Sequence, residues 1–313
     1  MRTVARIRFA GNHIPGGAQA VLGPARCGVD VATVDDVPVL RQIEVWVTLE
    51  KTDPRLPMLC QLLKKHGEDW LEWHEDHYTE EELDGAPLLL MHPNRQCEID
   101  GGVLWGMTYD LSVACPACGT GAPQTSAVFV DGDQLGELTG HRAGATYHGH
   151  VLVDEGLAAD LESSNATGLS FRGVYAVMPD KRQVKLRWKQ LCAGRTLPPM
   201  SPRTTGLTRN QACEVCGRNG YFRTNEAPTR IVYKASDLRD VDDVNLSWEN
   251  MWFASLEPEL RDSLLSWPWL LVTPKVRRVF LAAGVTSFDW LPIRVEDAEG
   301  NITLPGEQPT HPT

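Results

Sequence analysis

The stretches CPACG at residues 115–119 and CEVCG at residues 213–217 carry the most information about the fold. Two residues between a pair of thiolates let a tight turn aim both sulfurs at one metal ion, with metal–sulfur bonds of about 2.3 Å. The glycine after each pair allows the positive φ with which such a turn ends. Two turns of this kind predict a closed, tetrahedral four-thiolate site with a structural role, and zinc is the expected ion. The predicted ligands are Cys115, Cys118, Cys213 and Cys216.

Other interpretations of these cysteines stay open. Residues 119–212 separate the two pairs, which is long for one metal ribbon, but loop closure becomes costly only slowly with length. A thioredoxin-like redox pair is disfavoured because that motif opens a helix, and each pair here is followed by glycine. Two separate two-ligand sites or idle thiols are the remaining alternatives. The four cysteines without partner spacing are interpreted as buried small hydrophobes: Cys27, Cys60, Cys97 and Cys192.

The composition is that of an ordinary globular protein, with 42% apolar and 23% charged residues. The formal net charge of −11 disfavours general nucleic-acid binding, because affinity for phosphates depends on Lys and Arg that release counterions. This charge suits a basic protein partner, or it only keeps the protein soluble. No apolar stretch approaches the roughly 18 residues of a membrane helix, and no secretory signal opens the chain. We therefore expect a cytoplasmic protein with reduced thiols.

The first hundred residues are expected to form an α+β region of their own. The opening 40 residues predict short strands and turns, and residues 42–49 alternate as a half-buried strand does. From Leu56 to Leu83 the apolar residues recur at three- and four-residue steps, which predicts an amphipathic helix with an acidic face. His74 and His77 lie one turn apart on that helix, where metal binding and ordinary hydrogen bonding are both open. Gly102–Val113 predicts a strand that leads into the first cysteine pair.

An internal repeat is predicted when Val151–Val174 is aligned without gaps on Leu270–Ile293. In each copy a short apolar strand enters a helix, which ends near Asn165 or Gly284, residues that favour a left-handed cap. A second strand follows. Each copy also follows a Cys-x-x-Cys-Gly, which favours duplication over chance similarity.

The expected fold is therefore α+β, with two related strand–helix–strand units that each follow a zinc knuckle, and an N-terminal α+β region before them. The expected division is 1–100, 101–205 and 206–298, with a disordered tail at 299–313.

Motifs of an active site are missing from the sequence. It contains no phosphate loop, no G-x-G-x-x-G, no H-E-x-x-H and no G-x-S-x-G. His148 and His150 flank a glycine and could join Asp131 or His141 in a metal site, but a polar loop that enters the next strand is the simpler interpretation. We therefore expect that the protein is not an enzyme.

The doubled Cys-x-x-Cys-Gly resembles the double-CxxCG paralogous family of myxobacteria. The similarity is best from Cys213 to Val295, where the pair is followed by an acidic stretch, an apolar strand, a helix with the sequence VTPKVRRVF and a Gly-x-Thr turn into a strand. Cys115–Val174 resembles the first half of the family more loosely. Family members are immunity proteins against secreted polymorphic toxins, and the resemblance implies that function here. In the family the first pair lies near the N-terminus, so residues 1–114 are not explained by the resemblance.

The leading hypothesis is a cytoplasmic immunity protein in which a zinc-held scaffold presents an acidic, aromatic surface to a basic toxin. The resemblance supplies no toxin-binding residues, so the candidates come from two acidic segments that carry Trp, although core packing is an alternative for the second segment. These candidates are Trp70, Glu72, Trp73, Glu75, Asp76, Trp248 and Trp252.

Two other function classes remain in view. The first is a zinc-ribbon adaptor or regulatory protein associated with nucleic acid, for which Arg172–Arg187 is the one candidate basic stripe. The second is an enzyme of unknown chemistry. The sequence does not specify the oligomeric state.

Overall fold

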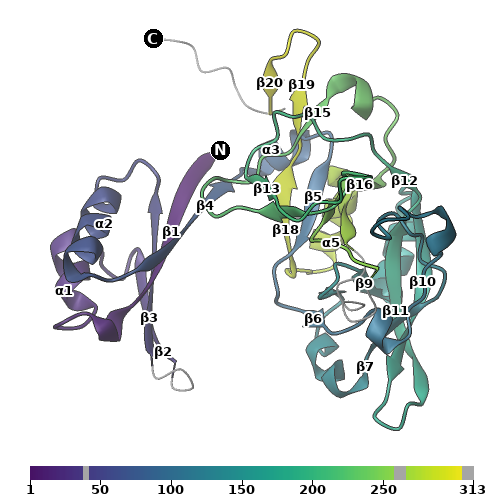
Figure 1. Ribbon diagram of the computed structural model, residues 1–313, viewed down its shortest axis with the longest axis horizontal. Coiled ribbons are helices and arrows are strands. Elements are labelled where there is room, and N and C mark those ends of the chain that lie inside the picture. The colour runs from purple at the N-terminus through teal and green to yellow at the C-terminus, as the bar shows by residue number, and fades with distance from the viewer. Residues whose placement is uncertain (38–41, 257–265, 305–313) are drawn as a thin grey trace. The chain divides into compact units, whose positions relative to one another are not determined.

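The computed structural model describes residues 1–37, 42–256 and 266–304 of the chain (Figure 1). The chain divides into two compact units. Unit 1 comprises Met1–Thr79 together with Arg223–Thr229, and unit 2 comprises Glu80–Phe222 together with Arg230–Thr313. The finer four-part division expected from the sequence stays a prediction. Within the described ranges, no helix has the length and apolar character needed to cross a membrane.

Unit 1 is built from four strands and two helices in the order β-α-β-β-α-β. Its sheet has the strand order β2-β3-β1-β4, and every pairing is antiparallel. This order defines a ferredoxin-like split βαβ arrangement. The elements are β1 (Arg2–Ala10), η1 (Gly11–His13), α1 (Gln19–Ala25), β2 (Ala32–Val37), β3 (Gln42–Glu50), α2 (Arg55–His66) and β4 (Trp70–His77).

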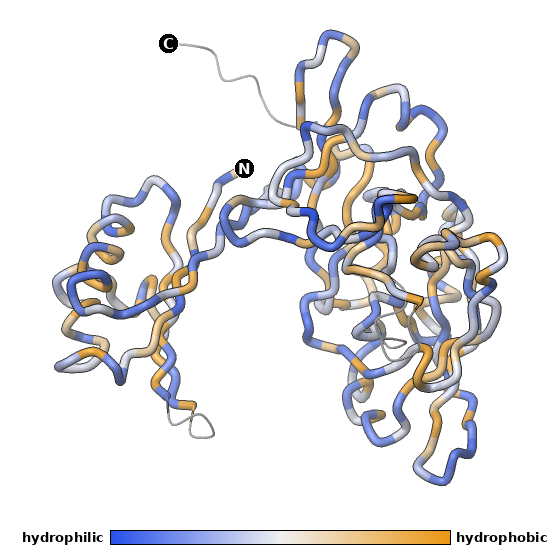
Figure 2. The backbone as a smooth tube through the Cα atoms, viewed as in Figure 1, coloured by the Kyte–Doolittle hydropathy of each residue, from blue (hydrophilic) through white to orange (hydrophobic). Residues whose placement is uncertain are grey.

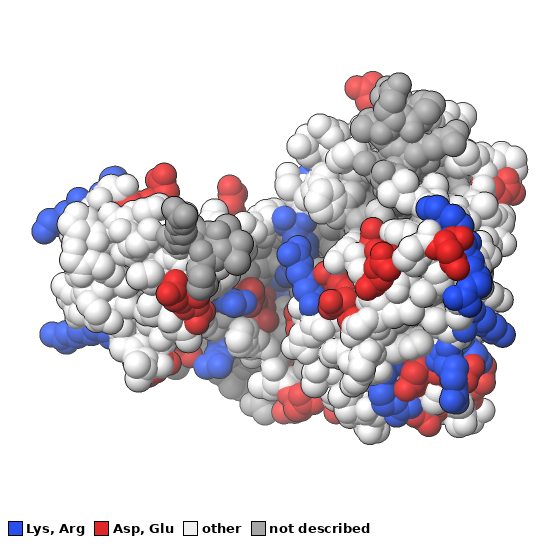
Figure 3. All heavy atoms as spheres, turned by 90° about the horizontal axis from the view of Figure 1, so that it is seen from below, with Lys and Arg blue, Asp and Glu red and all other residues white. Residues whose placement is uncertain are grey.

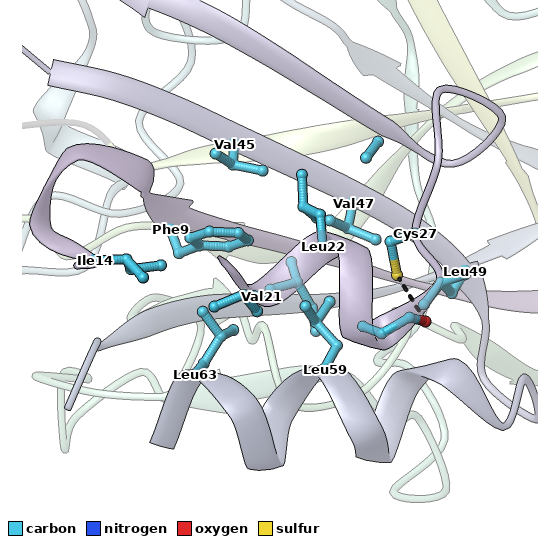
Figure 4. Packing of buried hydrophobic residues seen from close by; sticks show 13 residues of the cluster. Phe9, Ile14, Val21, Leu22, Cys27, Val45, Val47, Leu49, Leu59 and Leu63 are labelled. Atoms are coloured by element: carbon cyan, nitrogen blue, oxygen red, sulfur yellow. Dashed lines mark hydrogen bonds between the residues drawn. The ribbon is translucent and has the colours of Figure 1, made fainter. Parts of the chain in front are cut away.

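The core of unit 1 follows from alternation along the strands and helical spacing on α2. On β3, Val45, Val47 and Leu49 are buried, which confirms the half-buried strand predicted over residues 42–49. Leu59 and Leu63 lie one turn apart on α2 and are fully buried against the sheet (Figure 4). One helix, α1, falls in the opening 40 residues, where only short strands and turns were expected.

The long helix predicted from Leu56 to Leu83 is wrong. Helix α2 ends at His66, and Gly67 follows with a left-handed φ of 68° that caps it. Trp70–His77 then forms strand β4, which pairs with β1 along its whole length. The periodicity was ambiguous because these eight residues contain no breaker, and the exposed edge of β1 decided their conformation.

Unit 2 contains two larger sheets. The six-stranded sheet has the order β6-β8-β9-β11-β10-β7, and the five-stranded sheet has the order β12-β16-β17-β5-β18. The strands of the first are β6 (Glu98–Ile99), β7 (Val128–Asp131), β8 (Ala143–Thr146), β9 (Val151–Asp154), β10 (Leu169–Val177) and β11 (Gln183–Ala193). Those of the second are β5 (Leu89–Pro93), β12 (Arg195–Thr196), β16 (Val244–Met251), β17 (Trp267–Val272) and β18 (Phe288–Pro292).

Smaller elements complete unit 2. A two-stranded sheet joins β13 and β14, and a three-stranded sheet has the order β15-β19-β20. These strands are β13 (Leu207–Arg209), β14 (Tyr221–Arg223), β15 (Val232–Lys234), β19 (Arg294–Glu296) and β20 (Ile302–Thr303). The helices are α3 (Glu80–Gly85), α4 (Glu155–Ser163), α5 (Pro274–Ala282), η2 (Val103–Trp105), η3 (Leu111–Val113), η4 (Gly132–Leu138) and η5 (Ala235–Leu238). The fold is thus mixed α and β, and apolar residues concentrate in its central strands (Figure 2).

The strand predicted over Gly102–Val113 is also wrong. Two short 3-10 turns, η2 and η3, occupy half of this segment, and Tyr109 forms only an isolated bridge. Gly102 and Gly106 adopt φ values of 141° and 111°, and the Asp110 side chain accepts a hydrogen bond from the Ser112 N–H, which starts η3. These backbone conformations interrupt an extended strand.

The two segments aligned as a repeat each contain a strand, a helix and a strand. They are β9-α4-β10 and β17-α5-β18. Asn165 and Gly284 have left-handed φ values of 54° and 73°, as their positions after the helices predicted. Their relation as two copies of one unit stays a prediction.

Candidate metal centre

The four cysteines of the two Cys-x-x-Cys-Gly stretches meet in unit 2. Their four Sγ atoms all lie within 4.8 Å of one another, and they form the one group of three or more potential metal ligands within the described residues. Cys115 Sγ lies 3.9 Å from Cys213 Sγ, and Cys118 Sγ lies 3.7 Å from Cys216 Sγ. The predicted convergence of the two distant pairs is therefore confirmed.

These distances fit a tetrahedral metal ion. A zinc–sulfur bond of about 2.3 Å places two sulfurs of a tetrahedron roughly 3.8 Å apart. A disulfide would need a sulfur–sulfur distance near 2.05 Å, and all four thiols are free. Four thiolates leave no position open for water or substrate, so the centre is compatible with structural zinc.

Each pair sits on the tight turn that its spacing predicted. The Gly119 N–H donates to the Cys115 carbonyl, and the Gly217 N–H donates to the Cys213 carbonyl, at 2.8 and 2.9 Å. Both glycines take left-handed φ values, 78° and 66°, as the sequence indicated. A side chain at either position would strain the backbone, because L-residues rarely adopt this conformation.

Polar side chains around the turns support the sulfurs. Thr120 Oγ1 lies 3.2 Å from Cys118 Sγ and 3.2 Å from Ser266 Oγ, and both hydroxyls are buried. On the other turn, the Cys213 N–H donates to Asn219 Oδ1 at 2.7 Å. Such contacts fix the orientation of ligands around an ion.

The thiols differ in their readiness to ionise. Burial raises the pKa of Cys118 to about 12, and it also raises the pKa of Cys216. The backbone N–H of Cys216 lowers the pKa of Cys213 to about 7. A coordinated divalent cation would hold all four groups as thiolates, since a metal-bound thiol is deprotonated.

Aromatic and aliphatic side chains surround the centre and reach solvent. We define the Trp252 surface as Leu111, Phe222, Trp252, Leu256 and Trp267. The Trp252 ring contacts the rings of Phe222 and Trp267, with centroids 5.1 and 6.4 Å apart. Leu111 and Leu256 both lie within 4 Å of the Cβ position of Gly119, beside the first cysteine turn. The Trp252 surface therefore adjoins the metal centre.

Trp252 itself is held in a costly conformation. Its φ is 65°, a left-handed value that costs a non-glycine residue about 1–3 kcal/mol, and its side chain is 50% exposed. Two hydrogen bonds fix the backbone: Trp252 N–H donates to Tyr221 O, and Gly220 N–H donates to Trp252 O. Trp248 lies within strand β16, where it is partly buried, and Trp252 directly follows that strand.

The acidic residues proposed from the sequence for partner binding lie on β4 of unit 1. Glu75 forms an ion pair with Arg6 at 3.5 Å, and Glu72 contacts His74 Nε2 at 3.0 Å. Asp76 accepts a hydrogen bond of 2.6 Å from the Thr3 hydroxyl. Local partners in the fold therefore bind all three carboxylates.

The two tryptophans of β4 are also engaged within unit 1. Trp73 stacks on Trp46 with centroids 5.5 Å apart, and Trp70 packs against the apolar core. The prediction that these residues contact a partner is not tested by this geometry.

The histidines singled out in the sequence lie outside any cluster of metal ligands within the described part of the chain. His150 is partly buried, with Tyr109 Oη 3.2 Å from its Nε2 and Gln190 Nε2 3.2 Å from its Nδ1. Burial lowers the pKa of His150 to about 3, so the ring is neutral. His148 packs edge-on against Trp267, and His77 lies 4.0 Å from Glu75.

Sequence reasoning missed several apolar side chains beside the metal centre. Val113 precedes the first turn and Val215 lies inside the second, and they are 68% and 69% exposed. A signal was present in the sequence: a metal turn is small, so an apolar residue within it or just before it has little core to enter.

Comparison with protein-family models finds no family that matches the chain, and comparison with curated proteins finds no matching relative.

Proposed function

We propose that the protein is a cytoplasmic immunity protein, in which a Cys₄ zinc centre holds an aromatic surface that binds and neutralises a cognate toxin. The observation that carries the proposal is the half-exposed Trp252 beside a closed four-thiolate site. A closed site supplies rigidity rather than catalysis, because no ligand position remains for a substrate.

The conformation of Trp252 supports a binding role. A fold retains a left-handed tryptophan only where the surroundings enforce it, and such strain concentrates at functional positions. Tryptophan is also among the residues that contribute most to protein–protein affinity when a partner covers it. The Trp252 surface thus offers a preordered anchor, which lowers the entropic cost of binding.

The negative net charge of the chain supports the proposal that the partner is basic. The chain carries a net charge of −11, which would attract a basic toxin over long range and raise the association rate. Zinc fits the role of the metal because it favours tetrahedral thiolate coordination and has no redox chemistry of its own.

The strand order supports the two related units within this proposal. Strands β9 and β10 flank β11, and both pair with it antiparallel. Strands β17 and β18 flank β5 in the same way. In this interpretation each unit follows its own cysteine pair, and the metal joins the two knuckles of a duplicated fold.

Co-expression with a toxin tests the proposal. The probe is the toxic domain of a secreted polymorphic toxin encoded beside this protein. We expect the full chain to protect cells and to co-purify with the toxin, and Trp252→Ala to lose at least tenfold in affinity. Failure of the wild-type chain to bind or protect would overturn the immunity function.

Leu71→Ala provides the matched control. Leu71 is an exposed apolar residue of β4, beside the acidic residues proposed from the sequence. We expect this variant to bind normally. Loss of binding in Leu71→Ala with retention in Trp252→Ala would instead place the partner on β4.

A further inference from the structure

One face of the six-stranded sheet in unit 2 carries a row of aromatic side chains. Phe129 of β7 lies opposite Tyr175 of β10, and their rings pack with centroids 5.7 Å apart. Phe171 precedes them on β10, where Lys189 Nζ lies 5.6 Å from its ring centroid. All three aromatic residues are only partly buried. Phe129 and Tyr175 pack against each other, and Phe171 lies on β10 four residues before Tyr175.

A row of cations runs beside that strip on β11. Lys185 pairs across the sheet with Tyr175, and Lys189 pairs with Gly173, so both face the aromatic side. Arg187 lies between them in the sequence, and its side chain is 91% exposed. Neither lysine forms an ion pair within the described ranges, although Lys189 contacts the Phe171 ring.

A groove of about 390 Å³ opens at the hairpin end of this face. Val177 and Gln183, which pair with each other, line it together with Lys181 of the turn and Trp105 of η2. The buried indole N–H of Trp105 has no acceptor within the described residues. The groove therefore adds Lys181, a fourth cation, to the face.

The carboxylates near this face do not neutralise it. Glu155 accepts from Arg187 at 3.1 Å, and Asp180 lies 3.6 Å from Arg182. Asp131 shares the face at the end of β7. Three carboxylates thus lie among five cations in a chain whose net charge is −11, and Figure 3 shows Lys and Arg gathered along one side of the larger unit.

We propose that this basic–aromatic face, defined by Phe129, Phe171, Tyr175, Lys185 and Lys189, binds single-stranded nucleic acid. Aromatic rings that stack bases beside cations that bind phosphates are the combination by which single strands are held without sequence preference. An acidic protein segment would need the cations but would gain nothing specific from the rings. Because the chain as a whole is acidic, we expect nucleic acid to bind only at this face and not over the whole surface.

The sheet of unit 1 also carries aromatic rings beside cations, but there the cations are paired with carboxylates. Its Trp46 and Trp73 stack on each other at 16° between ring planes, so their inner faces are covered. Arg6 pairs with Glu75, and Arg8 pairs with Glu44. Both arginines of unit 1 are thus paired with carboxylates, whereas no carboxylate partner of Lys185 or Lys189 lies within the described residues, although Lys189 contacts the Phe171 ring.

The test measures binding of fluorescent oligouridylate and oligothymidylate to the full zinc-loaded chain over a salt series. We expect binding that weakens with salt, and a loss of at least tenfold in Lys185→Gln/Lys189→Gln with a log–log salt slope shallower by about 1.4. Tyr175→Leu keeps an apolar contact with Phe129 and should lose about fivefold or more with an unchanged slope. Preference for either oligonucleotide supports the proposal.

Lys64→Gln/Lys65→Gln makes the same charge change at two exposed lysines of α2 and should bind like wild type. Equal losses in both double variants would show that net charge alone acts, and would overturn the proposal. Tight binding of polyglutamate, unaffected by Tyr175→Leu, would overturn it in favour of an acidic protein. Toxin capture should persist in Lys185→Gln/Lys189→Gln, so this site and the immunity function can fail separately.

Discussion

Unit 1 and unit 2 achieve stability by different means. Unit 1 is a single split βαβ fold whose strands and helices enclose one apolar cluster. Unit 2 distributes its apolar residues over separate clusters and brings together turns from residues 115–119 and 213–217 at a thiolate centre. A small fold with short connections closes its core unaided. A larger one with long connections gains most from a cross-link, because a metal offsets the entropy of closing a long loop.

The largest loss of stability is expected when the metal is removed from unit 2. A strong chelator, or Cys118→Ser, should destabilise unit 2 by several kcal/mol, because the free energy of metal binding contributes directly to folding. Hydrogen exchange should accelerate around residues 111–123 and 209–222 and leave β1 and β3 protected. Cys60→Ser, which alters a thiol of unit 1, should leave metal content at one ion per chain. If unit 2 stays protected from hydrogen exchange without metal, its stability does not depend on the metal, and the proposed difference between the two units is wrong.

The second largest loss of stability is expected from a cavity in the core of unit 1. Leu63→Ala removes a fully buried side chain of α2 and should cost about 2–5 kcal/mol, through lost transfer free energy and a cavity. Chemical denaturation followed by hydrogen exchange should locate the loss in β1, β3 and α2. Met58→Ala, at a half-exposed position of the same helix, should cost less than about 1 kcal/mol. Equal loss of protection in unit 2 would show that the units unfold together.

A smaller effect depends on acid and is confined to unit 2. Burial alone would raise the pKa of Asp243, but hydrogen bonds from Thr273, the Thr167 N–H and Lys275 outweigh it and hold the pKa below its usual range. A depressed carboxyl pKa adds stability at neutral pH, which is lost as pH falls from the unfolded value of about 3.9 through the lower folded value.

Asp243→Asn should therefore lower the stability by about 1–2 kcal/mol at neutral pH and flatten its dependence on acid. Thermal melting between neutral pH and pH 3 measures both effects. Asp240→Asn, at an exposed position, should leave the acid dependence unchanged. A slope that Asp243→Asn does not alter would rule out this carboxylate as the source.

The smallest effect on stability is expected at Trp252. Asparagine is among the L-residues that adopt left-handed φ most readily, so Trp252→Asn relieves strain while it removes the contact with Phe222. We expect the free energy of unfolding to change by less than about 1 kcal/mol, and toxin affinity to fall as in Trp252→Ala. A large destabilisation would assign Trp252 to the fold of unit 2 rather than to binding.

Local chemistry made part of the fold and site predictable. The cysteine spacing and the following glycines predicted both turns, and alternation predicted strand β3. Trp70–His77 was predicted wrongly because its local pattern suits a helix and an edge strand equally, and only pairing with β1 separates them. Trp252 gave no local signal of its left-handed backbone, since Tyr221 and Gly220 of another segment impose it.

By itself, the sequence determined the four thiols that could bind a metal ion, the turn geometry of each cysteine pair and the net charge of −11. Only the tertiary structure decided that the two pairs meet at one centre, that β4 is a strand and that Trp252 faces solvent beside the metal site. Spacing and propensity act over a few residues and can be identified in the sequence. Which distant segments meet depends on the balance of chain entropy against burial over the whole chain, which only the folded molecule shows.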